Sequence, residues 1–245
     1  MFDNIVEFSS KERIIENKEL YPIPCKLNIP EWFKELEHTV DDRTIKGCMP
    51  FLDTLTTGYL LKIPLELYLQ HNVIYEGKKT TFLKTGQFST FQNSILNINK
   101  KDETNIHLTK QLGKCPYVHK NKNLPFQKIM NPWIIKTPPG YSCLFVPPLN
   151  NKDDRFSIIP GIVDTDTYPG EINFPIIVNG DKYPVLETII SAGTPYVQVI
   201  PFKRESWKMK IKVNTIKEGT KFIHKIGEKI LHSYKSTWWN KKTWK

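Results

Sequence analysis

The sequence predicts a mainly β protein, of the β-sandwich or barrel-like kind, that ends in one amphipathic helix. Three observations predict this class. Eighteen prolines against twelve glycines favour many short strands joined by stiff turns. Runs of β-branched residues recur between turn signals, most densely in residues 160–202. Only one long stretch, residues 215–238, has apolar residues at helical spacing.

Composition limits the class of protein further. The chain has 245 residues, 39% of them hydrophobic, which is enough to bury a core. No apolar run reaches the roughly 18 residues of a membrane span, and the N-terminus lacks the layout of a secretory signal. We therefore expect a protein of the cytoplasm. The net charge of +10 permits binding to nucleic acid or an acidic partner, but no nucleic-acid module is visible.

The cysteines and histidines do not form a recognisable metal motif. The four cysteines are far apart and form no CxxC pair, which favours free thiols in a reducing compartment. Cys48 in particular is expected to be buried and structural. The six histidines lack paired Cys/His spacing, so no structural zinc is expected.

We expect four segments along the chain. They are an extended arm (1–30), a β-rich half (31–124), a second β half (125–213) and a basic amphipathic helix with its tail (214–245). The first half should hold a short helix at 30–36, a turn at Gly58 leading into a buried strand, and a hairpin within 66–92. The second half should hold strands at 133–136, 141–146, 176–178, 189–190, 197–200 and 209–213.

The functional lead is an acidic turn that follows a short apolar run. Asp164, Asp166 and Glu171 fall within eight residues of one another, directly after Ile162 and Val163. Loops positioned by a rigid β scaffold are where binding residues concentrate. Outside this turn, Asp53 is expected to cap a turn.

The acidic turn also resembles a motif of a known family. Residues 161–172, GIVDTDTYPGEI, are similar to the third motif of trimeric dUTPases, and Ile190–Ile200 is similar to the strand that follows it there. This resemblance covers residues 130–203 and implies a dUTPase-like β-clip. It gives Asp164 a catalytic, water-orienting role and places Tyr168 on the sugar, with Asp166 and Glu171 beside the substrate. A homo-oligomer would also follow from it.

The resemblance has departures that bear on activity. Pro147–Asn150 stands where the family has Pro-Arg-Ser, and the Gly-rich phosphate clamp at the C-terminus is missing. A triphosphate needs several donors and cations around it. Most of the chain also resembles an uncharacterised family encoded by tailed phages of marine bacteria, with Asn173–Pro175 and Ala192–Trp207 among the similar stretches.

Two functions of different classes follow. The first is a phage-encoded, β-rich binding protein without catalysis and without a cofactor. The alternative is a metal-assisted enzyme that acts on a nucleotide or another small anion through residues 164–171, with Mg²⁺ as the implied ion. The partner is not identified by the sequence.

Overall fold

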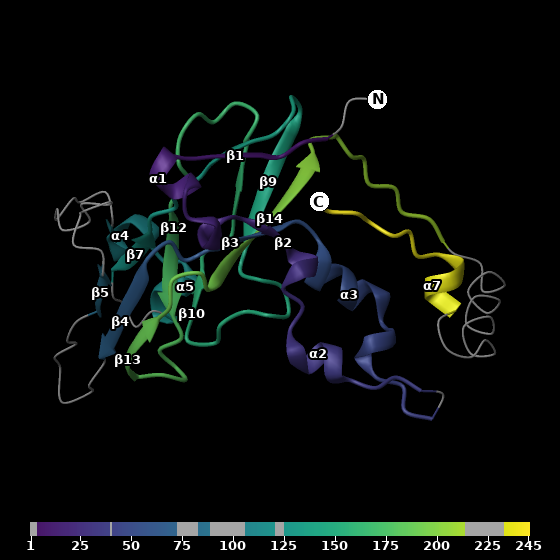
Figure 1. Ribbon diagram of the computed structural model, residues 1–245, viewed down its shortest axis with the longest axis horizontal. Helices are drawn as coiled ribbons and strands as arrows, with labels where there is room; N and C mark the ends of the chain where they lie inside the picture. Colours follow the sequence, from purple (N-terminus) through teal and green to yellow (C-terminus); the bar gives the residue numbers. More distant parts are fainter. Residues whose placement is uncertain (1–3, 40, 73–82, 89–105, 121–124, 214–232) are drawn as a thin grey trace. The chain divides into compact units, whose positions relative to one another are not determined.

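Two compact units make up the chain. The computed structural model describes residues 4–39, 41–72, 83–88, 106–120, 125–213 and 233–245 (Figure 1). The first unit combines Met1–Ile23 with Tyr59–Lys203, and the second combines Pro24–Gly58 with Arg204–Lys245. Each unit is therefore built from segments far apart in the sequence, a division that differs from the four consecutive segments expected above.

The first unit is mainly β, as predicted, with its strands in antiparallel sheets. Its short helices are α1 (Glu12–Ile15), α4 (Thr109–Leu112) and α5 (Pro116–Lys120). Its strands are β1 (Glu7–Ser9), β2 (Ile23–Pro24), β3 (Tyr59–Lys62), β4 (Glu66–Asn72), β5 (Leu83–Phe88), β6 (Ile106–His107), β7 (Phe126–Ile129), β8 (Ile134–Lys136), β9 (Tyr141–Val146), β10 (Phe156–Ile158), β11 (Gly161–Val163), β12 (Phe174–Val178), β13 (Val185–Ile190) and β14 (Pro195–Lys203).

The sheet that positions the acidic turn has the strand order β11-β9-β14-β3-β2. β14 lies in its middle, pairing with β9 on one side and with β3 on the other (Figure 1). Val197 and Val199 of β14 are fully buried, as β-branched side chains in a central strand should be. Because β3 lies before and β9 after the expected boundary between residues 124 and 125, β14 joins the two predicted β halves in one sheet.

Further sheets enclose the same core. Their strand orders are β10-β12-β7-β6, β13-β4-β5 and β1-β8. One hydrophobic cluster takes buried side chains from β3, β4, β7–β10 and β12–β14. Aromatic rings anchor this core: the centroids of Phe145 and Phe174 lie 5.4 Å apart, and Tyr196 packs edge-on against Phe174. The predicted strands at 176–178, 189–190 and 197–200 are confirmed.

The predicted turn at Gly58 and the predicted hairpin within 66–92 are also met where the structure describes them. Gly58 has φ +75°, the left-handed conformation that glycine tolerates, and the buried strand β3 follows it. β4 and β5 pair antiparallel, as the hairpin within 66–92 requires, although residues 73–82 at its tip lie outside the described residues. β1 of the arm pairs with β8 at an edge.

The described part of the second unit contains short helices joined by irregular chain. The α-helices described there are α2 (Glu31–Glu35), which confirms the predicted helix at 30–36, α3 (Met49–Thr56) and α7 (Ser233–Thr237). The rings of Phe33 in α2 and Phe51 in α3 stack at 5.7 Å. From the C-terminal tail, Trp239 and Lys242 donate to Asp53 in α3, with the Lys242 Nζ 2.6 Å from its carboxylate. Asp53 therefore lies within a helix and holds the tail, so the turn-cap prediction was wrong.

Two more predictions need correction. Cys48 is exposed, although it directly precedes α3 and the buried Met49. Residues 209–213 do not form a strand, because no described strand pairs with them. Most of the predicted helix at 215–238 falls on residues 214–232, outside the described residues.

Candidate functional site

The acidic turn begins where β11 leaves its sheet at Val163. Backbone N–H groups of Thr167 and Tyr168 donate to the carbonyl of Asp164, which closes a tight turn. Thr165 points inward and is fully buried, whereas Asp164 is exposed and Asp166 is half-buried. The local sequence therefore divides into one inward hydroxyl flanked by two outward carboxylates.

Both carboxylates accept hydrogen bonds from neighbouring residues, one in β9 and one in the turn before it. Ser142 Oγ donates to Asp164 Oδ1 over 2.6 Å, and the Gly140 backbone N–H donates to Asp166 Oδ2 over 2.8 Å. Gly140 has φ +83°, so the tight turn that presents its N–H depends on glycine. The acidic turn is thus fastened to the turn between β8 and β9.

A chain of buried hydroxyl groups lies beneath the turn. The Oγ1 atoms of Thr137 and Thr165 are 2.8 Å apart, and the Thr165 hydroxyl also reaches Cys143 Sγ at 3.4 Å. Burial raises the pKa of the Cys143 thiol to about 11, although the Thr165 hydroxyl partly opposes the shift. Cys143 is therefore a protonated packing group rather than a nucleophile.

The two remaining predicted residues lie further along the turn. The Tyr168 side chain is 43% exposed, and its hydroxyl turns back toward the carbonyl of Glu171 at 3.3 Å. Lys136 Nζ donates to the Tyr168 carbonyl at 2.7 Å, and Glu171 forms a β-bridge with Ile134. Asp164 is therefore held by β9 and Asp166 by the turn before it, whereas Tyr168 and Glu171 are held against β8.

These carboxylates do not come together as a set of metal ligands. Within the described residues, no group of three or more His, Cys, Asp or Glu side chains has an arrangement that could hold a metal ion. The described arrangement of Asp164, Asp166 and Glu171 therefore does not fit one shared Mg²⁺ ion.

A second charged cluster lies between the loop before β10 and the turn after β12. Arg155 Nη2 pairs with Asp153 at 2.6 Å, and Arg155 Nη1 donates to Thr188 in β13. Asp154 accepts from Lys182 and from the Tyr183 hydroxyl. The hydrogen bond from Lys182 lowers the pKa of Asp154, and the Tyr183 hydroxyl adds to this effect. This cluster cross-links two loops at the surface.

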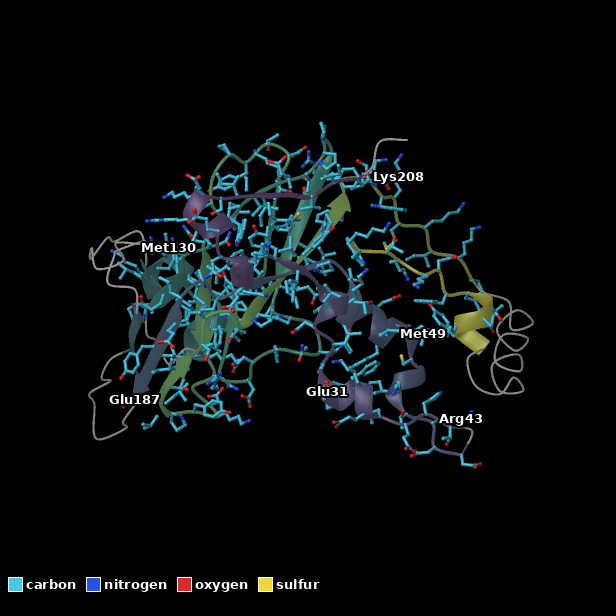
Figure 2. The ribbon with its side chains drawn as sticks, viewed as in Figure 1. Glu31, Arg43, Met49, Met130, Glu187 and Lys208 are labelled. Carbon is cyan, nitrogen blue, oxygen red and sulfur yellow. The ribbon has the colours of Figure 1, made fainter. Side chains whose placement is uncertain are left out.

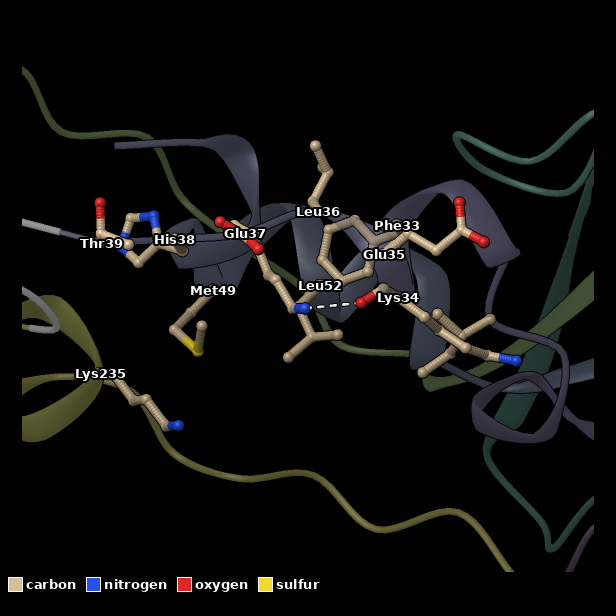
Figure 3. Close-up of a pocket in the computed structure, with 12 residues that line it drawn as sticks. Phe33, Lys34, Glu35, Leu36, Glu37, His38, Thr39, Met49, Leu52 and Lys235 are labelled. Atoms are coloured by element: carbon tan, nitrogen blue, oxygen red, sulfur yellow. Dashed lines mark hydrogen bonds between the residues drawn. The ribbon is translucent and has the colours of Figure 1, made fainter. Parts of the chain in front are cut away.

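The second unit contains an open cavity of about 810 Å³ between α2 and α3 (Figure 3). Phe33, Leu36, Met49 and Leu52 give it an apolar floor. His38 beside it accepts from the Thr44 N–H at Nδ1 and packs over Gly47, where an added Cβ would lie 2.3 Å from the ring. Nothing in the sequence spacing of His38 and Gly47 indicates this packing.

The most exposed apolar side chains follow β14. We call residues 207–213 the alternating segment: Trp207, Met209, Ile211 and Val213 are 84–96% exposed, and a lysine stands between each pair. Figure 2 labels Lys208 at its start. Sequence reasoning predicted only a strand at 209–213 here.

Comparison with protein-family models and with curated proteins gave no match to this chain. None of the described helices combines the length and the apolar composition needed to cross a membrane.

Proposed function

We propose that this is a β-rich, phage-encoded binding protein, without catalytic activity of its own, that engages a macromolecular partner through the alternating segment. The observation that carries this is the exposure of Trp207, Met209, Ile211 and Val213. Burying one such side chain in a partner is worth about 1.5–3 kcal/mol. Contiguous exposed apolar surface of this kind marks an interaction site.

The form of the segment supports the same function. Apolar and basic residues alternate with period two, so an extended chain presents one apolar side and one lysine side. The partner that fits such a strand has apolar and acidic groups arranged along an edge. Peptide segments that bind in this way gain affinity from main-chain hydrogen bonds and specificity from alternate side chains.

The contacts of the acidic turn support a structural role for it within this function. Its two carboxylates accept from Ser142 and from the Gly140 N–H, and the hydroxyl between them is buried. We include in the proposal that residues 130–203 form a dUTPase-like β-clip in a sandwich-like fold. The support is the antiparallel pairing of β11 with β9, followed by the acidic turn and later by β14.

The experiment that tests the binding function places a photo-reactive amino acid at position 207. We expect a discrete covalent adduct with one partner when the protein is cross-linked in the cells that produce it. The paired substitutions Met209→Asp and Ile211→Asp should abolish the adduct. Ile5→Asp with Leu27→Asp, which changes two other exposed apolar residues, should leave it intact. An adduct that survives the first pair as well as the second would refute the proposal.

One observation favours the second candidate, an enzyme that acts on a nucleotide or another small anion. Asp164 is exposed at the end of β11 with its carboxylate oriented by Ser142, and the Tyr168 ring is part-exposed on the same turn. A carboxylate held in this way is able to orient a water molecule. Calorimetric titration with dUTP, dCTP and Mg²⁺ separates the candidates: a binding protein gives no heat, and an enzyme gives heat that Asp164→Asn removes.

A further inference from the structure

The alternating segment does not pair well with itself. If two copies of the segment paired antiparallel around Lys210, Lys208 of one copy would lie opposite Lys212 of the other, on the same face. Shifting the centre by half a step instead sets a lysine opposite an apolar residue in every pair on both faces, so no pair has opposite charges and neither face is wholly apolar. Like charges directly opposite are destabilising, and a one-residue slip moves a whole side-chain set to the other face. The segment therefore needs a strand of different composition.

The edge of β13 has the complementary composition. Within the described residues, β13 pairs with β4 on one side only and ends its sheet on the other. On its outer face Glu187 stands between Val185 and Ile189, which are 61% and 58% exposed. Its inner face carries Leu186, Thr188 and the buried Ile190. Such an open edge with apolar side chains is a ready template for another strand.

One register satisfies both faces at once. With Lys210 opposite Glu187 in an antiparallel pair, the two opposite charges meet on the outer face. On the inner face Ile211 then lies opposite Leu186, and Trp207 lies opposite Ile190. The aliphatic stems of Lys208 and Lys212 cover Ile189 and Val185, and their ammonium groups stay in water.

The alternating segment cannot pair with the β13 edge of its own copy of the chain. β13 pairs with β4 and β14 pairs with β3 in the next sheet, and β14 runs on away from β13 (Figure 1). From Pro195 to Lys203, β14 is about 26 Å long at 3.3 Å per step. The four steps from Lys203 to Trp207 span at most about 14 Å, so they cannot bring the segment back to Ile190.

We propose that the alternating segment of one copy adds as a strand to the β13 edge of a second copy. The interface is head-to-tail, because the surface that donates differs from the surface that accepts, so it generates a closed ring or an open filament. This inference rests on the proposed binding function and names its partner. Figure 2 labels Glu187 on the accepting strand and Lys208 on the donating segment.

The test is charge reversal in the full chain, followed by sedimentation at several protein concentrations. The unmodified protein should associate as its concentration rises. Lys210→Glu and Glu187→Lys should each weaken association roughly fivefold, because an opposite-charge pair becomes a like-charge pair. The double variant, which restores opposite charges in exchanged positions, should recover most of the lost association.

Two controls match these variants. Lys114→Glu makes the same charge change as Lys210→Glu at an exposed lysine away from β13 and should leave association unchanged. Tyr68→Phe removes the 2.5 Å hydrogen bond from Tyr68 to Glu187 without changing charge, and it should also have no effect. These controls separate the interstrand charge pair from net charge and from the local bond.

Two results would overturn the inference. The first is a protein that sediments as a monomer at every concentration. The second is a double variant that associates no more strongly than the single variants Lys210→Glu and Glu187→Lys. Either result would show that a second copy is not the partner. Neither result would contradict the proposed binding function, because that function is tested separately by the cross-linked adduct at position 207. An adduct whose mass equals that of two chains supports both proposals, whereas an adduct with a different protein overturns this one alone.

Discussion

Ser142 is fully buried, and its hydroxyl donates to the exposed carboxylate of Asp164 at 2.6 Å. Ser142 lies in β9, and Asp164 begins the turn that follows β11, the strand paired with β9. The bond therefore joins a buried donor to an acceptor in contact with water. This asymmetry determines what each substitution should do.

Removing the acceptor should destabilise the protein more than removing the donor. Asp164→Ala takes this acceptor from a buried hydroxyl and should lower the free energy of unfolding by about 1–3 kcal/mol. Ser142→Ala leaves a carboxylate that water can solvate and should cost about 1 kcal/mol. Urea unfolding measures both. Equal costs, or costs no larger than that of Lys152→Ala, would contradict the structural role of the turn.

The thiols should react in an order set by burial. Cys48 is exposed and should be modified quickly by a maleimide in the folded protein. Burial raises the pKa of Cys25 to about 12 and that of Cys143 to about 11, so their thiolate populations at neutral pH are very small. Mass spectrometry of timed samples should place the first label on Cys48. Cys48→Ser should remove the fast phase, and fast labelling of Cys143 would contradict its burial.

The Asp154 cluster should stabilise the protein only within a window of pH. Lys182 lowers the pKa of Asp154 below its ordinary 3.8, and Asp154 in turn raises the pKa of Lys182 above its ordinary 10.5. The contribution of Asp154 is thus present above pH 3.8 and is lost as pH falls through its folded pKa. The contribution of Lys182 is present below pH 10.5 and is lost as pH rises through its raised pKa.

Asp154→Asn should accordingly lower the unfolding temperature slightly at pH 7, because the pair is exposed to solvent. The difference from the unmodified protein should shrink as the solution is acidified below pH 3.8. Thermal unfolding followed by circular dichroism over this range measures it. A difference that grows on acidification would have the wrong sign for this pair.

Asp53 should hold the C-terminal tail in the second unit. Its carboxylate accepts from Trp239 Nε1 at 3.1 Å and from Lys242. Asp53→Ala should release the tail, which trypsin would then cleave several-fold faster after Lys241 and Lys242. Asp41→Ala removes an exposed carboxylate from the same unit and should not change the rate. Unchanged cleavage in Asp53→Ala would show that other contacts hold the tail.

The strands were predictable because their signals are local. These signals depend only on neighbouring residues; examples are Gly58 before an apolar run and the β-branched run Ile176–Val178. The division into units was not predictable, because β14 joins strands from both halves and pairing partners leave no local signal. The same applies to the acidic turn: its composition predicted a site, but the donors Ser142 and Gly140 that hold it lie more than twenty positions earlier.

Burial of individual residues was the other difficulty. The alternating segment has the pattern of a half-buried strand, yet no described strand pairs with it. A sequence pattern alone does not show whether such a segment is paired. Cys48 has an apolar neighbour on the C-terminal side, Met49, which is buried, yet Cys48 itself is exposed. At helix starts, adjacent residues point in different directions, so burial does not follow composition.

The central place of β14 has a consequence for how the protein is made. Leu60 and Gln198 are direct neighbours in the sheet, although most of the chain separates them. During synthesis β3 and β9 leave the ribosome long before the strand that must lie between them. Their edges then stay open until Lys203 has emerged. Topologies with such distant pairings fold slowly and expose strand edges while they wait, so the nascent chain should depend on chaperones until β14 is inserted.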